Sequence, residues 1–114
     1  MSEPVVKGYH AHIYYDPKTS RETAARVRAG LTKFNVQLGS WHDGPVGPHL
    51  DAMYQALFSA EEFGKVVPWL MLNREGLSVL VHPSTGEAYG DHLVRSLWLG
   101  ERLQLNAAAL RRAG

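Results

Sequence analysis

The stretch GYHAHIYYD, residues 8–16, decides the fold because its aromatic and β-branched side chains are typical of a β-strand with two different faces. Successive side chains of a strand point to opposite sides. One side of this strand carries small and apolar side chains: Ala11, Ile13 and Tyr15. The other side carries His10, His12 and Tyr14. We expect the apolar side to pack under helices, which leaves two imidazoles on the opposite face of a sheet.

The segments after this strand predict an alternating order of elements. Asp16 and Pro17 indicate a turn, and Ser20 is a suitable N-cap for a helix with apolar residues at helical spacing. Further strands are expected at 36–41, 49–58 and 77–82, and a second helix at 60–75, kinked or divided at Pro68. Residues 91–114 predict a turn or short helix and a helical tail. The order βαββαβ predicts an α+β, ferredoxin-like sandwich with a C-terminal extension, and we expect a single domain over residues 1–114.

Alternation along the other strands adds residues to the histidine face. On 49–58 the apolar set is Leu50, Ala52, Tyr54, Ala56 and Phe58, and the opposite set is His49, Asp51, Met53 and Gln55. On 77–82 the core set is Leu77, Val79 and Val81, and the opposite set is Ser78, Leu80 and His82. We expect the third strand to run parallel to the first and the fourth to run antiparallel to it. His49 and His82 would then both lie beside His10.

Histidines gathered in this way favour a metal site. Imidazole is the commonest protein ligand for zinc, iron, copper and nickel, and we expect a divalent metal at His10, His12, His49 and His82. Two histidines with the Asp51 carboxylate would instead form the facial triad of non-haem Fe(II) oxygenases. A histidine that is not a ligand suits proton transfer, and His12 and His49 are the candidates for this catalytic role. The alternative is a set of solvated or hydrogen-bonded histidines without a metal.

Composition excludes several other classes of function. The chain has 114 residues, a formal net charge of +1 and no cysteine. The near-neutral charge gives no electrostatic footprint for nucleic acid or an anionic membrane, and the lack of cysteine excludes disulfides, thiolate nucleophiles and cysteine-ligated metals. Neither a signal peptide nor a long apolar segment is present, so we expect a cytoplasmic protein.

Four separated blocks of the sequence together resemble one family of enzymes. The blocks are YHAHIYYD, GPHLDAMYQALF, LSVLVHPSTGEAYGDH and SLWLGERLQL, and they lie between about Gly8 and Asn106. They resemble the DOPA 4,5-dioxygenase family of small extradiol dioxygenases. The resemblance implies a ferredoxin-like fold, usually as a dimer, and cleavage of a catechol ring by O₂ with Fe(II).

The resemblance also bears on the residues of the site. By matching position, the histidines of the family fall at His10, His12, His49, His82 and His92, although we assign no role to His92. Relatives often have proline or another apolar residue near Leu50 and Asp51, which favours an all-histidine site over one that uses Asp51. The implied substrate is L-DOPA or a related catechol, and the product a seco-DOPA of the muconic semialdehyde type.

Two further expectations concern partners and rival functions. Tyr14, Met53 and Leu80 would leave an apolar patch on the bare sheet face, so we expect a homodimer that covers it. The rivals to the dioxygenase are a metal-independent ferredoxin-like enzyme, in which histidines act only as acid and base, and a non-catalytic ligand-binding module.

Overall fold

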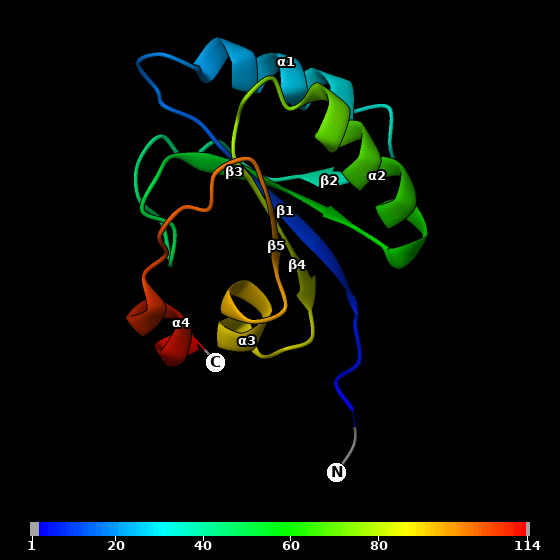
Figure 1. The fold of residues 1–114 in the computed structure, drawn as a ribbon, viewed down its shortest axis with the longest axis vertical. Helices are drawn as coiled ribbons and strands as arrows, with labels where there is room; N and C mark the ends of the chain where they lie inside the picture. Colours follow the sequence, from blue (N-terminus) through cyan, green and yellow to red (C-terminus); the bar gives the residue numbers. More distant parts are fainter. Residues whose placement is uncertain (1–2, 114) are drawn as a thin grey trace.

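The computed structural model describes residues 3–113 as an antiparallel sheet with helices on both of its faces (Figure 1). The elements in chain order are β1 (Gly8–Tyr14), α1 (Arg21–Leu31), β2 (Gln37–Leu38), β3 (Met53–Phe58), α2 (Ala60–Asn73), β4 (Val79–Ser84), α3 (Ala88–Leu93), β5 (Leu97–Leu99) and α4 (Ala107–Ala113). The strand order is β2-β3-β1-β4-β5, and every neighbouring pair is antiparallel. The ferredoxin-like α+β fold predicted from the sequence is therefore confirmed.

The main core lies between the sheet and the helices α1 and α2, which Figure 1 shows together on one side. Ala11 and Ile13 of β1 are fully buried there, as are Val79 of β4 and Leu31 of α1. On α1 the buried residues are spaced by three and four positions: Ala24, Val27 and Leu31. The predicted core side chains of the strands contribute to this core, with the exception of Leu50, which precedes β3 and is exposed.

Two predictions about the third strand are wrong. The strand β3 runs antiparallel to β1, because the crossover through α1 gives β2 the direction of β1 and the chain then reverses before β3. The strand also begins at Met53 rather than at residue 49. His49 instead closes a tight turn in which its backbone N–H and C=O bond to Val46. Pro45 precedes this turn and Pro48 lies within it, and proline has no N–H to donate to a strand ladder.

The ends of the other elements also differ from the predictions. Only Gln37–Leu38 forms a strand within the predicted stretch 36–41. The helix α2 continues through Pro68. The C-terminal region forms α3, the edge strand β5 and α4, with β5 paired to β4.

The C-terminal segment covers part of the second sheet face. Tyr14, Met53, Leu80 and Leu105 form a second buried cluster, against which Leu93 of α3 and Trp98 of β5 pack. The apolar patch on which the homodimer was predicted is thus already covered within the chain, and this argument for a dimer does not hold. The homodimer itself stays a prediction. Within residues 3–113, the helices lack the length and apolar character that crossing a membrane requires.

Candidate metal centre

Five of the six histidines of the chain gather on the sheet face opposite α1 and α2. His10 and His82 are direct neighbours across the β1–β4 ladder, and His12 lies two positions further along β1. The turn before β3 adds His49, and α3 adds His92, whose ring centroid lies 3.9 Å from that of His82. Elements distant in sequence thus bring their imidazoles to one place.

The ring nitrogens form two overlapping groups that could hold a metal ion. In one group the ligand atoms of His10, His12 and His82 all lie within 4.8 Å of one another. The other group consists of His12, His49 and His92, by the same measure. His12 belongs to both. The structure therefore brings His10 and His82 together with His12, but it places His49 in the other group.

Backbone carbonyls orient two of these rings. The Nδ1–H of His82 donates to the carbonyl oxygen of Pro83 at 2.8 Å, and the Nδ1–H of His92 donates to that of Ala88 at 2.8 Å. A carbonyl can only accept, so in the neutral rings each Nε2 keeps a free lone pair. Metal-binding histidines in proteins commonly use one nitrogen in this way and coordinate with the other.

His12 is as enclosed as His82, and each of the two has 3% of its surface exposed. Its Nε2 lies 3.0 Å from Nε2 of His82. Its Nδ1 is buried and has no hydrogen-bond partner among residues 3–113. A buried imidazole nitrogen without a partner is costly, and no hydrogen bond from the described residues fixes which nitrogen of this ring carries the proton.

His49 is held by a tyrosine. Its Nδ1 lies 2.7 Å from the hydroxyl group of Tyr14, and both side chains are buried. Burial, and to a smaller extent the charge of Asp51, raises the pKa of Tyr14. The phenol therefore stays protonated at neutral pH and fixes the plane of the His49 ring.

The cluster is uncharged at neutral pH. Burial, with the neighbouring His92, lowers the pKa of His82 to about 3, and burial with His92 and His42 lowers the pKa of His49 to about 4. Burial also lowers the pKa of His10, His12 and His92. Each ring then has one nitrogen without a proton, which is the form that binds a metal.

A buried carboxylate supports the helix that carries His92. Asp91 accepts hydrogen bonds from the backbone N–H of Thr85 at 2.8 Å, from the Thr85 hydroxyl at 2.6 Å and from Arg95 at 3.3 Å. Burial alone would raise the pKa of Asp91, but these bonds hold it below its usual value. Because its oxygens are already engaged, Asp91 is a poor metal ligand and instead ties α3 to the end of β4.

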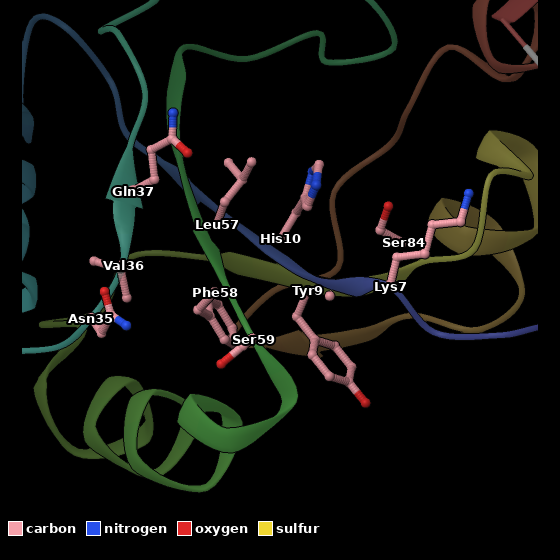
Figure 2. A pocket seen from close by; sticks show the side chains of 11 residues that line it. Lys7, Tyr9, His10, Asn35, Val36, Gln37, Leu57, Phe58, Ser59 and Ser84 are labelled. Atoms are coloured by element: carbon pink, nitrogen blue, oxygen red, sulfur yellow. The ribbon is translucent and has the colours of Figure 1, made fainter.

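Two cavities adjoin the cluster. The smaller, of about 220 Å³, is lined by His10, His82, Ser84, Gly86, Ala88, Asp91 and His92. The larger, of about 470 Å³, shares His10 and Ser84 with it and continues along Gln37 and Leu57. Figure 2 shows the side chains of His10, Leu57 and Gln37 on the same side of the sheet in this larger cavity. Of the histidines, His10 lies at the junction of the two cavities.

The four histidines proposed from the sequence as metal ligands, His10, His12, His49 and His82, thus lie close together. Their role as ligands stays a prediction. His92 joins them, although the sequence left it without a role. The only earlier sign of it was its match to a histidine of the family, because a histidine in a short helix has no alternation pattern to place it.

Two other candidates lie outside both histidine groups. Asp51 is exposed and lines a separate cavity with Leu50 and Pro17, so it does not complete a facial triad. His42 is half-buried and pairs through its backbone with Met53. With these two excluded, the donor set is all imidazole, which suits iron, zinc, copper or nickel.

Comparison with known proteins gives three relationships. Residues 9–109 match the Dopa 4,5-dioxygenase family. DOPA 4,5-dioxygenase from Amanita muscaria is 33% identical over 114 residues, which cover 92% of this chain but 50% of that protein. An uncharacterised 21.2 kDa protein from Botryotinia fuckeliana is 35% identical over 130 residues, which cover 98% of this chain and 70% of that protein. This chain thus spans half the length of the Amanita enzyme.

A crystal structure from Nostoc punctiforme has the same fold. That protein, named provisionally as a dioxygenase, is 57% identical and superposes with a TM-score of 0.92. The match covers 96% of this chain and 95% of that one.

Proposed function

Because this chain belongs to the Dopa 4,5-dioxygenase family, we propose that it is an extradiol dioxygenase that uses Fe(II) and O₂ to open a catechol ring. The substrate would be L-DOPA or a related catechol. Cleavage next to the two hydroxyl groups, rather than between them, would give a seco-DOPA product of the muconic semialdehyde type. Both atoms of O₂ would end in the product, so the reaction needs no other oxidant.

We assign the metal to His10, His12 and His82. This group is favoured because two of its members, His10 and His82, line the smaller cavity, whereas only His92 of the alternative group does so. Bound Fe(II) would supply open coordination positions for the catechol oxygens and O₂, and would let electron density pass between them. The neutral state of the three rings at pH 7 favours a divalent ion at this place.

The remaining histidines would serve proton transfer. His92 lines the smaller cavity, and its Nδ1–H bond to Ala88 leaves Nε2 as a proton acceptor. Nε2 of His92 would therefore take a proton from the catechol hydroxyl. His49, the acid or base candidate from the sequence, lies behind His12 and is fixed by Tyr14, so it would act by holding a proton near the His12 ring.

One observation carries this proposal: of three unprotonated imidazoles that share a 4.8 Å neighbourhood, two, His10 and His82, line a cavity with a further imidazole, His92, in its wall. His12 and His82 are buried, each with 3% of its surface exposed, so these two rings do not belong to a solvated histidine patch. The group of His12, His49 and His92 is the alternative metal position, and it would leave His10 and His82 facing the substrate.

The test is oxygen uptake by protein loaded anaerobically with Fe(II), across a panel of catechols, followed by mass analysis of the product formed from ¹⁸O₂. Ring-opened product that carries both labelled atoms is the expected result. No oxygen uptake by fully loaded protein would overturn the dioxygenase and favour the ligand-binding module. Turnover without any metal would favour the metal-independent enzyme.

A further inference from the structure

Among the side chains that line the larger cavity and that the proposed reaction does not use, Lys7 is the one with a positive charge. Lys7 immediately precedes β1, and its backbone N–H donates to the carbonyl oxygen of Ser84 at 2.8 Å, which extends the β1–β4 ladder by one residue. Ser84 lines both cavities. The backbone thus fixes Lys7 at the place where the two cavities meet.

The amine of Lys7 lies near Gly86, at the wall of the smaller cavity. Its Nζ lies 3.9 Å from the position that a Cβ atom on Gly86 would occupy, and Gly86 lines the smaller cavity together with His10, His82 and His92. Figure 2 shows Lys7, Ser84 and His10 pointing to the same side of the sheet. A substrate bound at the histidines would therefore have a cation within reach of its side chain.

Lys7 is the one lysine or arginine among the residues that line these two cavities. It forms no ion pair with the carboxylates of residues 3–113, so its charge is available to a ligand. Arg95 is the nearest competitor, since it borders another cavity next to His82. Its guanidinium, however, is already paired with Asp91 and Glu87.

The rest of the larger cavity suits the body of a substituted aromatic ring. On the side of His10, Leu57 gives it an apolar wall, and Gln37 and Ser84 add an amide and a hydroxyl group. Tyr9 and Phe58 line it from the opposite side of the sheet, where they pack in the main core. Its volume is about 470 Å³, whereas that of the smaller cavity is about 220 Å³, so it has more room for a ring substituent. A catechol ring at the histidines could extend its substituent past His10 into this space.

We propose that Lys7 is a specificity-determining residue that binds the carboxylate of an anionic side chain on the catechol. The proposal rests on the proposed function, because it places the ring at the histidine cluster. The ammonium group would donate charge-assisted hydrogen bonds to the carboxylate, and a neutral substituent would gain nothing from it. Substrates would thus be selected by charge at a point remote from the reacting hydroxyls.

The test compares two catechols that differ in charge, 3-(3,4-dihydroxyphenyl)propionate and 4-ethylcatechol. Their dissociation constants are measured by tryptophan fluorescence on Fe(II)-loaded protein without oxygen, and their KM values by oxygen uptake. Lys7→Met should weaken binding of the propionate about tenfold and leave 4-ethylcatechol within about twofold. Lys7→Arg should keep most of the preference, because the charge remains.

Lys18→Met is the matched control, because Lys18 lies in the turn beyond the other end of β1 and lines neither cavity. It should bind both catechols as the unaltered protein does. Equal weakening of both ligands by Lys7→Met, or no weakening of either, would overturn the role of Lys7. If binding depends on charge as expected but no oxygen is consumed, the role of Lys7 holds and the proposed reaction is overturned. If oxygen is consumed and Lys7→Met changes the KM of neither catechol, the reaction holds and the role of Lys7 is overturned.

Discussion

The Nε2 atoms of His12 and His82 lie 3.0 Å apart in the interior of the protein. The only proton of the neutral His82 ring is on Nδ1, because that nitrogen donates to Pro83. At most one proton, from His12, can therefore lie between the two Nε2 atoms, and Nδ1 of His12 then has no partner among residues 3–113. A divalent cation that uses both lone pairs fits this pair better than a single proton does.

Replacement of His82 by alanine should abolish stoichiometric iron binding. The change removes one of the three proposed ligands and the ring that faces Nε2 of His12. Loss of one ligand or of its support commonly costs a site at least about tenfold in metal affinity. Iron is measured by metal analysis of protein purified without oxygen.

His42→Ala is the control, because His42 belongs to neither histidine group and should bind iron normally. His49→Ala and His92→Ala should also retain iron under our assignment. If those two variants lost the metal while His82→Ala kept it, the alternative group of His12, His49 and His92 would be the site.

The sequence was sufficient to predict the fold and most of the histidine face, because a period of two places every second residue of a paired strand on one side. His10, His12 and His82 follow this rule, as they lie on β1 and β4. His49 comes close to them for a different reason. Its turn, closed on Val46 and paired with Leu105, returns the ring to the sheet, and alternation cannot predict such a turn.

The short helix and helical tail predicted for the C-terminal segment are present as α3 and α4, but the strand β5 and the contribution of α3 to the site were missed for a related reason. The strand β5 is only Leu97–Leu99, and its pairing with β4 depends on an edge that is formed by the rest of the sheet. The helix α3 is six residues long, which is too short for a clear apolar period. His92 and Asp91 lie on that helix, so their place in the site became visible only in three dimensions.

The metal-free protein should lose stability as the pH falls below about 6.5. The pKa of His82 is about 3 and that of His49 about 4 in the folded protein, so the unfolded chain binds more protons than the folded one between these values and 6.5. The contribution of these histidines to stability is fully present above about pH 6.5 and is lost progressively on acidification towards pH 3. Each of these histidines should contribute a loss of about 1 to 2 kcal/mol between pH 6.5 and 5.

Urea unfolding of chelator-treated protein at several pH values measures this loss. His82→Gln should make the dependence shallower by the share of one histidine, whereas Leu72→Gln, an uncharged change at an exposed position, should leave it unchanged. A free energy of unfolding that is flat from pH 7 to pH 5 would contradict the neutral, buried state of the cluster.

Tyr14→Phe should destabilise the protein by about 1 to 2 kcal/mol without creating a large cavity. The substitution removes only the hydroxyl group, but it leaves Nδ1 of His49 buried without its 2.7 Å partner. Tyr89→Phe is the control, because its hydroxyl accepts one exposed bond at 3.3 Å from Arg111 and should matter little. Equal urea midpoints for the two variants would show that the Tyr14–His49 bond contributes nothing to stability.

Asp91→Asn should slow turnover without removing the iron. Asp91 receives the Thr85 N–H and hydroxyl and the Arg95 guanidinium, and it directly precedes His92. An amide at this place presents an NH₂ group to one of these donors, which should cost about 1 to 3 kcal/mol and loosen the start of α3. His92 would then hold its Nε2 less well toward the cavity, so the rate of oxygen uptake at saturating catechol should fall while iron content stays stoichiometric.

Glu87→Gln is the matched control, since Glu87 pairs with the same Arg95 at 3.6 Å from an exposed position and should change stability by less than about 0.5 kcal/mol. Loss of iron from Asp91→Asn would instead make His92 a ligand, and unchanged turnover would remove His92 from proton transfer.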